Sequence, residues 1–192
     1  MFYSVEFSEE EIDFCVEMGV RRNEAKRNQT VSRGWPPRVK HIMGVYAEYA
    51  CQKYLNATMD WEVYGKRGDS SRPDGILPDG RSLVVKSVGR SDLGGIWIPK
   101  VCLDAAGSSD VVVAFQVIPV EQSFSTYFYG SLGFLGWKSV ENFLEQGKEN
   151  RKHYDAQESL PGRKLSRDIC WVLEKSRLNA VEMLLGELGL LK

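Results

Sequence analysis

Apolar positions recur along the chain with two different periods. Between about residues 9 and 26, and again over Val39–Leu55, they follow the spacing of an amphipathic helix. Ser8 and Glu11 have the spacing of a capping box at the start of the first of these segments. The chain is therefore predicted to open with two helices, joined by a loop that contains a pair of prolines.

Beyond Asn56 the apolar positions alternate with polar ones, which is the period of a β-strand. The tetrad Pro-Asp-Gly-Arg at 78–81 is a turn signal, because proline presets φ and glycine accepts a positive φ. Two strands joined by this turn form a hairpin. Strands are predicted at Trp61–Tyr64, Gly75–Leu77, Arg81–Val88, Asp110–Pro119 and Thr126–Ser131. A short helix or loop is predicted at 96–107, helices at Trp137–Gln146 and Asn179–Leu191, and a polar connection at 147–170.

This order of elements predicts a single α/β domain over residues 1–192. The length is that of one ordinary domain, and no composition shift marks a boundary. The expected architecture is a central mixed sheet of about four to five strands flanked by helices. Its core spans about residues 38–146, with an N-terminal helix before it and a C-terminal helical extension after it.

Composition narrows the class of protein. The sequence contains no run of about 18 apolar residues, so no membrane span is predicted. Residues 1–13 lack the pattern of a secretory signal. Cys15, Cys51, Cys102 and Cys170 lie far apart, and only two histidines accompany them. This spacing argues against a zinc site or a disulfide framework, so we expect a cytoplasmic protein.

The charge is close to balanced overall but uneven along the chain. A net charge of −1 gives no general attraction to nucleic acid. Residues 21–40 nevertheless carry seven basic side chains against one acidic side chain, and a second basic cluster lies between 151 and 167. The first cluster is open to two interpretations: contacts with phosphates, or an exposed helix whose early acids and later bases complement its own dipole.

Candidate chemistry lies on the predicted hairpin. Asp74 stands at the start of one strand and Lys86 on the next, so pairing across the turn would bring both to the same end of the sheet. An acid and a lysine held together can bind a divalent metal, orient a water molecule and stabilise charge on a phosphate. Glu48, on the preceding helix, either reaches the same site or is exposed.

These residues carry a resemblance. Glu48 on a helix, then Arg72-Pro73-Asp74-Gly75, then Leu83-Val84-Val85-Lys86-Ser87, resembles the PD-(D/E)xK nuclease superfamily. The similarity is to small phage and bacterial members related in motif style to Holliday-junction resolvases and restriction endonucleases. It implies a restriction-endonuclease-like core that binds Mg²⁺ or Mn²⁺ and acts on nucleic acid, with DNA as the expected partner and no membrane.

The resemblance also assigns roles. Asp74 and the backbone carbonyl of Val85 would be metal ligands, and Glu48 would complete or tune the metal site. Lys86 would position the attacking water or stabilise charge on the phosphate, and Ser87 could hold the nucleophile or a phosphate. The further residues that we expect to contact nucleic acid are Arg33, Arg38 and Arg72.

One position departs from the family pattern. Val84 stands where an acid is expected, and it shares a strand face with Lys86. Valine cannot ligate Mg²⁺, which requires oxygen. Glu48 could supply the missing carboxylate, Asp69 or Glu62 could reach in, or the site could be inactive.

Two classes of function therefore remain open. The first is a metal-dependent nuclease of phage or bacterial DNA metabolism, located in the cytoplasm of a bacterial or phage-infected cell. The second is a catalytically inactive nuclease-like module that binds nucleic acid or a protein partner. A homodimer is compatible with either, because many nucleases of this fold act as dimers.

Overall fold

The computed structural model describes residues 4–26, 36–64, 72–88, 95–104, 106–107, 110–118, 131–152 and 168–191. These residues form a mixed α/β fold with one six-stranded and one three-stranded sheet. The elements in chain order are β1 (Ser4–Val5), α1 (Glu9–Ala25), α2 (Pro37–Leu55), β2 (Thr58–Met59), β3 (Gly75–Ile76), β4 (Ser82–Val88), β5 (Gly95–Pro99), α3 (Lys100–Asp104), β6 (Val111–Ile118), β7 (Ser131–Ser139), α4 (Val140–Gln146), β8 (Lys148–Lys152), β9 (Asp168–Glu174), a 3₁₀ turn (Lys175–Arg177) and α5 (Val181–Glu187).

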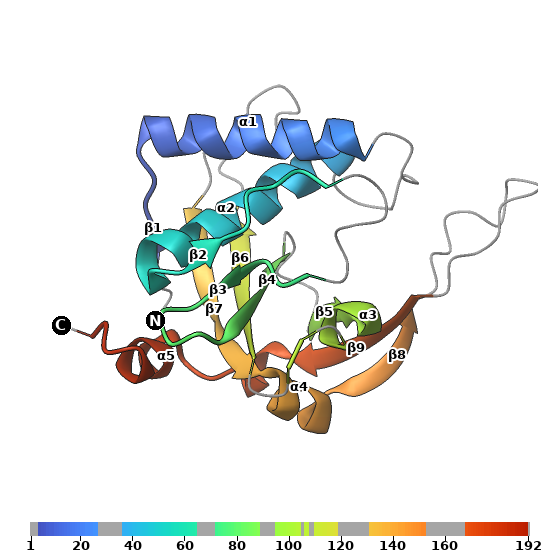
Figure 1. The fold of residues 1–192 in the computed structure, drawn as a ribbon. Helices are drawn as coiled ribbons and strands as arrows, with labels where there is room; N and C mark the ends of the chain where they lie inside the picture. The colour runs from blue at the N-terminus through green and yellow to red at the C-terminus, as the bar shows by residue number, and fades with distance from the viewer. Residues whose placement is uncertain are drawn as a thin grey trace, which may run out of the picture.

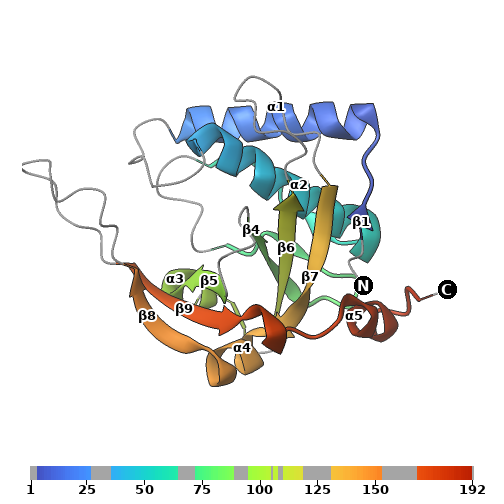
Figure 2. The same cartoon turned by 180° about the vertical axis from the view of Figure 1, so that it is seen from behind.

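The larger sheet has the strand order β1-β7-β6-β4-β3-β2. Strands β2, β3 and β4 form an antiparallel meander, while β4 and β6 run parallel. Strand β7 is antiparallel to both β6 and β1, and Figure 2 shows β6 and β7 side by side. The predicted mixed α/β class is therefore confirmed, and this sheet has more than the four to five strands expected.

Helix α2 covers one face of the sheet, and α1 lies over α2 on the side away from the strands (Figure 1). The alternation of β4 directs Leu83 and Val85 toward α2. A separate apolar cluster joins the two helices. Its buried members are Cys15, Met18, Ile42, Val45 and Tyr46.

The opposite face of the sheet is covered by the three-stranded sheet, of order β5-β9-β8, together with α3 and α4. Val84 of β4 points into this second core. The buried residues of the core are Val84, Ile96, Ile98, Leu103, Val112, Ala114, Val140, Phe143 and Leu173. Burial of each large side chain contributes about 1.5–3 kcal/mol to the stability of the fold. Both faces of the sheet are therefore stabilised by packing against other elements.

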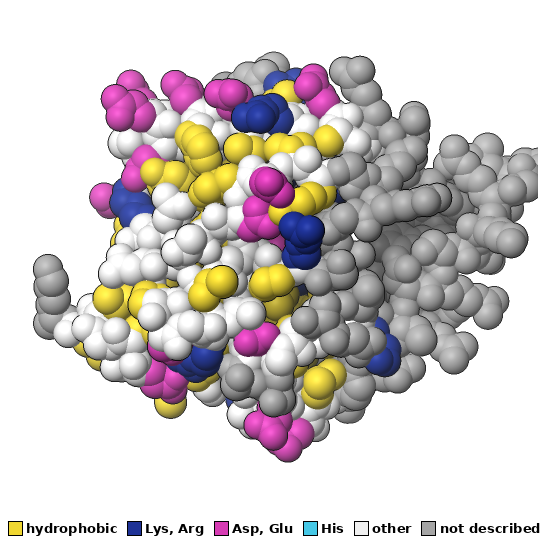
Figure 3. All heavy atoms as spheres, viewed as in Figure 1, with side chains coloured by type: hydrophobic (Ala, Val, Ile, Leu, Met, Phe, Trp, Pro, Cys, Tyr) yellow, Lys and Arg dark blue, Asp and Glu magenta, His cyan; other side chains and the backbone are white. Residues whose placement is uncertain are grey.

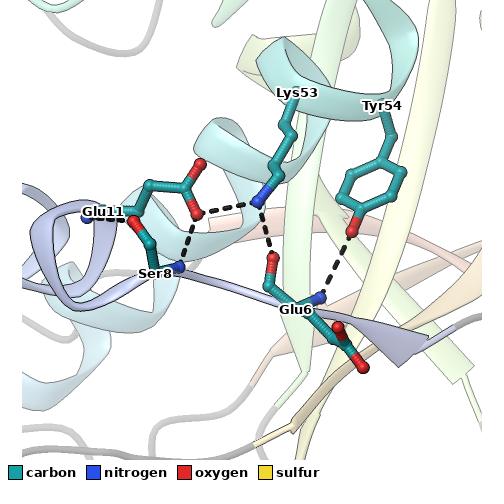
Figure 4. A network of polar contacts seen from close by, with 5 residues as sticks. All are labelled: Glu6, Ser8, Glu11, Lys53 and Tyr54. Atoms are coloured by element: carbon teal, nitrogen blue, oxygen red, sulfur yellow. Dashed lines mark hydrogen bonds and ion pairs between the residues drawn. The ribbon is translucent and has the colours of Figure 1, made fainter.

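Polar contacts fix the N-terminal segment to α2 (Figure 4). The predicted capping box is present: Ser8 N–H donates to Glu11 Oε2 at 2.7 Å, and Glu11 N–H donates to Ser8 Oγ at 3.3 Å. Lys53 Nζ donates to the same Glu11 oxygen and to the carbonyl of Glu6, both at 2.8 Å. Glu6 N–H donates to Tyr54 Oη at 3.3 Å. The start of α1 is thereby held against the C-terminal half of α2.

The predicted turn between β3 and β4 is confirmed. Leu77 N–H donates to Arg81 O and Gly80 N–H to Leu77 O, both at 2.9 Å, and Gly80 has φ of +89°. Asp79 accepts from the backbone N–H and from Nε of Arg81, as expected of a turn residue.

The segment before α5 is joined to β7 through a close backbone approach. Trp137 N–H donates to Asn179 O at 3.0 Å, and Asn179 N–H donates to Trp137 O at 2.9 Å. Gly136 has φ of +141°, and a Cβ atom there would lie 2.4 Å from Asn179 O. Only glycine fits this position, which explains a glycine inside a paired strand.

Several predicted elements were wrong. Trp137–Gln146 is not one helix, because β7 continues to Ser139 in register with β6 and only then does α4 begin. Residues 61–64 form no strand. The strand in this part of the chain is β2, which lies earlier, at Thr58–Met59. Residues 96–107 do contain a short helix, α3, as predicted, but strand β5 precedes it and pairs with β9.

The predicted polar connection at 147–170 contains β8 and the start of β9, which pair with each other. The C-terminal helix, predicted over Asn179–Leu191, is confined to Val181–Glu187. The strand predicted at Thr126–Ser131 lies outside the described residues except for Ser131, where β7 begins. The two N-terminal helices are confirmed, within one or two residues at each end.

Candidate functional site

Asp74 is fixed at the junction of β3 and β4 by its backbone and its side chain. Its N–H donates to Leu83 O at 2.8 Å, and its carbonyl accepts from Asp60 N–H at 3.0 Å. Its carboxylate Oδ2 accepts from Val85 N–H at 2.6 Å. The side chain of Asp74 thus takes the place of a backbone acceptor beyond the N-terminal end of β3, which orients the carboxylate along the edge of β4.

Among the described strands, β3 pairs with only the first part of β4 on this edge. Strand β3 pairs with β4 at Ser82 and Leu83, whereas β6 pairs with the whole of β4 as far as Val88. The N–H and C=O of one strand residue point to the same edge. Because the N–H of Val85 meets Asp74, the carbonyl oxygen of Val85 faces the same side.

Lys86 follows on β4, half-buried, on the face that Val84 also occupies. Val84 is 4% exposed and belongs to the apolar core with Ile96 and Ile98. Burial raises the pKa of the Cys102 thiol on α3, and the positive charge of Lys86 opposes that change. The charge of Lys86 therefore reaches α3, and Val84, two residues earlier on the same face of β4, is a core residue.

Glu48 is the buried carboxylate of α2, with 7% of its surface exposed. Its Oε1 accepts from Arg22 Nη1 at 2.6 Å, while Oε2 is buried with no hydrogen-bond partner among the described residues. Burial raises the pKa of Glu48 to about 7, against the hydrogen bond and charge of Arg22; Asp74 adds to the rise and Lys86 reduces it. The charges of Asp74 and Lys86 thus both act on Glu48, although Lys86 stands on the face of β4 opposite to α2.

Arg22 of α1 is the site residue that sequence reasoning missed. Its guanidinium donates to Glu48 through Nη1 and, through Nη2, to the carbonyl of Asp60 at 3.1 Å. Asp60 N–H in turn binds the carbonyl of Asp74. A signal was available, because Cys15, Met18 and Gly19 are buried and Arg22 lies on the same helical face. A charge within an apolar stripe indicates a buried partner.

The end of α1 contributes a further cation. Burial lowers the pKa of Lys26, Arg22 and Lys86 lower it further, and Glu48 and Asp74 raise it. Lys26 therefore lies in the field of the same groups. Burial also lowers the pKa of His41 to about 4, with Lys26 and Arg22 acting in the same direction. His41 is consequently neutral at neutral pH.

The other candidates lie at varied distances from this centre. Arg72 is exposed and its Nη1 donates to Tyr64 Oη at 2.8 Å, with its guanidinium 4.8 Å from the centroid of the ring. Tyr64 Oη donates to Asp60 Oδ2 at 2.7 Å, which links this pair to the turn beside Asp74. Ser87 is half-buried on β4, Arg38 is exposed at the start of α2, and Glu62 is exposed. Arg33 and Asp69 lie outside the described residues.

Asp110 has a structural role, as its place before an apolar strand suggested. Its buried carboxylate accepts from Ser82 N–H at 2.9 Å and from Gly107 N–H at 2.5 Å. Its carbonyl accepts from Val140 N–H at 2.7 Å. These contacts join the starts of β4, β6 and α4 and leave the side chain no part in the site.

The available oxygen atoms limit the kind of metal site. In the part of the chain that the structure describes, no three Asp, Glu, His or Cys side chains are grouped to hold a metal. Asp74, the carbonyl of Val85 and the unpaired Oε2 of Glu48 are oxygen donors. This set suits Mg²⁺ or Mn²⁺ that keeps several water ligands, rather than an ion enclosed by protein.

The chain matches no family model, no curated protein and no solved structure at the level that shows a relationship. None of the described helices is long and apolar enough to cross a membrane. The arrangement of the site is therefore the basis on which function can be argued.

Proposed function

We propose that the chain is a metal-dependent nuclease with a restriction-endonuclease-like core, hydrolysing DNA phosphodiester bonds. The observation that carries the proposal is the unpaired, buried oxygen of Glu48, a carboxylate whose pKa responds to Asp74 and Lys86. A buried acceptor without a donor costs about 1–3 kcal/mol. Such atoms, and carboxyls with strongly raised pKa values, concentrate at functional sites.

Each residue has a distinct role in this proposal. Asp74, the Val85 carbonyl and Glu48 would hold Mg²⁺ or Mn²⁺. When bound, the ion lowers the pKa of a water ligand and neutralises charge on the phosphate. Lys86 donates to a phosphate oxygen or to the attacking water, and Ser87 offers a hydroxyl to the phosphate one residue further along β4. The Val85 N–H keeps Asp74 oriented.

The fold is compatible with this assignment. The meander β2-β3-β4 is followed by β6 parallel to β4, with helices on both faces of a mixed sheet. The central sheet flanked by helices that the resemblance implies has the same general form. The free, buried thiols of Cys15 and Cys51 suit the reducing cytoplasm that we propose for the protein.

Charge on the surface favours one direction of approach for DNA. The outer face of α1 carries exposed acids, which repel phosphates (Figure 3). The exposed acids of the first three turns are Glu9, Glu10, Asp13 and Glu17. Arg22 and Lys26 lie at the other end of the same helix, beside the site. We therefore place the DNA at the C-terminal end of α1, where Arg72 and Arg38 would make further phosphate contacts.

A catalytically inactive nuclease-like module is the second candidate, and Val84 favours it. At the position where the resemblance has an acid, the side chain is apolar and packed in the core. Such a module would keep its phosphate contacts through Lys86 and Lys26 without cutting.

A cleavage assay separates these functions. Single-stranded, duplex and branched DNA are incubated with the protein in Mg²⁺, Mn²⁺ or chelator, beside Asp74→Asn, Lys86→Met and Glu48→Gln. Asp79→Asn is the matched control, because Asp79 is an acid of the same hairpin that contacts Arg81 instead of the site. Lys53→Met is the control for Lys86.

Metal-dependent cutting that the three site variants abolish and the two controls retain supports the nuclease. Cutting that survives Asp74→Asn, or that proceeds in chelator, overturns the proposed site. Salt-sensitive DNA binding without cutting, weakened by Lys86→Met, supports the inactive module.

A further inference from the structure

The guanidinium of Arg22 joins the two elements that carry the candidate metal ligands. One nitrogen holds Glu48 of α2 at 2.6 Å, and the other holds the carbonyl of Asp60 at 3.1 Å. The backbone of Asp60 continues to Asp74 through a 3.0 Å hydrogen bond. Because the fork of arginine is planar and rigid, these two contacts fix both partners relative to each other.

The contact at Glu48 is selective for one oxygen. Oε1 is occupied by Arg22, whereas Oε2 is buried and has no partner within the described residues. If the role of the ion pair were only to neutralise Glu48, a bidentate contact with both oxygens would serve better. The arrangement instead immobilises the carboxylate and leaves one buried oxygen without a partner among the described residues.

From this geometry we infer that Arg22 is a positioning residue of the metal site: it fixes Oε1 of Glu48 so that Oε2 faces a divalent cation. This inference rests on the proposed function, because it concerns the same site. It also assigns a part of that site to α1, which lies outside residues 38–146.

The charge of Arg22 makes the inference testable. A cation close to a metal site repels the metal, so an arginine that acted only through its charge would weaken Mn²⁺ binding, and its removal would strengthen binding. A positioning role has the opposite sign. Loss of a residue that orients a metal ligand lowers metal affinity about 10–100-fold.

The chain contains a matched control. Lys53 and Glu11 form a second ion pair between the same two helices, with Nζ and Oε2 2.8 Å apart, at the opposite end of the contact. Lys53→Ala removes a basic side chain and an inter-helix contact, as Arg22→Ala does, without touching Glu48. Differences between these variants therefore report on the site rather than on helix packing.

The experiment is a calorimetric titration of the full chain with Mn²⁺ alone, at neutral and at mildly alkaline pH. The variants are Arg22→Ala, Arg22→Lys, Lys53→Ala and Glu48→Gln, and a thermal melt of each confirms folding. Arg22→Ala is expected to weaken Mn²⁺ binding about 10–100-fold at both pH values. Arg22→Lys keeps the charge and one contact but loses the fork, so it is expected to fall between Arg22→Ala and the starting protein.

In the Glu48→Gln background, Arg22→Ala is expected to add little, since the two residues act as a unit. If Arg22→Ala fails to fold, the Mn²⁺ affinity of Arg22→Lys is compared with that of Lys53→Ala instead. Mn²⁺ binding that depends on Glu48 but is unchanged or strengthened in the Arg22 variants overturns the positioning role and leaves the proposed function intact. No Mn²⁺ binding by the starting protein overturns both.

Discussion

Replacing Glu48 by glutamine removes a carboxyl group whose ionisation opposes folding. Burial raises the pKa of Glu48 from 4.5 to about 7, although Arg22 and Lys86 favour the charged form. Each pKa unit corresponds to about 1.4 kcal/mol between the folded and unfolded states. The rise at Glu48 therefore corresponds to about 3 kcal/mol of stability that depends on pH.

The sign follows from proton binding. Below about pH 4.5 the carboxyl is protonated in both states and contributes nothing to the pH dependence. Between pH 4.5 and about 7 the folded state holds a proton that the unfolded state releases. Stability is then lost as the pH rises through this window, and the loss is complete above the folded pKa. Glutamine cannot ionise, so Glu48→Gln is expected to gain stability relative to the starting protein as the pH rises.

The measurement is urea unfolding of both proteins at about pH 5 and about pH 8, where the other titrating groups cancel in the difference. A chelator is present throughout, because a bound cation would favour the ionised carboxylate. Glu11→Gln is the control on the other helix: burial raises the pKa of Glu11, but contacts with Lys53 and Ser8 outweigh it and leave the pKa lowered. Its contribution is lost at acid pH, so Glu11→Gln should differ from the starting protein equally at both pH values.

A difference between the starting protein and Glu48→Gln that is the same at the two pH values would refute the reasoning. It would mean that Arg22 compensates the burial of Glu48 and that the carboxylate is ionised throughout. The open oxygen would then be an ordinary part of a structural ion pair, and the argument for a metal ligand at this position would be lost.

Three further changes test the packing around the site. Val84→Glu is expected to lower the free energy of unfolding by more than about 3 kcal/mol in urea, because it places a charge in the apolar core; a smaller loss would show that position 84 reaches the polar site. Gly136→Ala is expected to cost at least about 2 kcal/mol by the same measurement, because its Cβ meets Asn179 O at a positive φ. Asp110→Ala is expected to lower the thermal midpoint, because it leaves the half-buried N–H of Ser82 unpaired and removes the contact with Gly107 N–H; an unchanged midpoint would contradict this.

Local signals in the sequence were sufficient for the first helices and for the hairpin. The capping box of Ser8 and Glu11 and the turn at 78–81 are formed by residues within four positions of each other. Such contacts depend little on the rest of the fold. Asp74 likewise meets β4, at Val85, because the two strands are joined by a short hairpin.

Long-range pairing decided the elements that were wrong. The segment 131–139 contains Gly133 and Gly136, weak as strand residues, yet it pairs with β6 along its length. Strand β8 is almost wholly charged or polar and forms by pairing with β9. The local sequence pattern does not identify β6 as the partner of β7 or β9 as the partner of β8, because pairing and burial easily override strand propensity.

The site was predicted in part for the same reason. Glu48 was left open between a ligand and an exposed acid, because helical spacing does not state which partner a carboxylate meets. Arg22 was counted only among the basic residues of 21–40, which were left open between contacts with phosphates and an exposed helix that complements its own dipole. Its contact with Glu48 spans 26 positions and depends on the way α1 crosses α2.

The packing of α1 across α2 determines how far the chain can be shortened from its N-terminus without disturbing the proposed site. The sequence motif begins within α2, so a shortened chain starting at Pro37 would retain every residue of the resemblance. It would also expose Ile42, Val45 and Tyr46, which α1 covers, and it would leave Glu48 without a counter-ion. The N-terminal helix is therefore as much a part of the proposed site as the strand that carries Lys86.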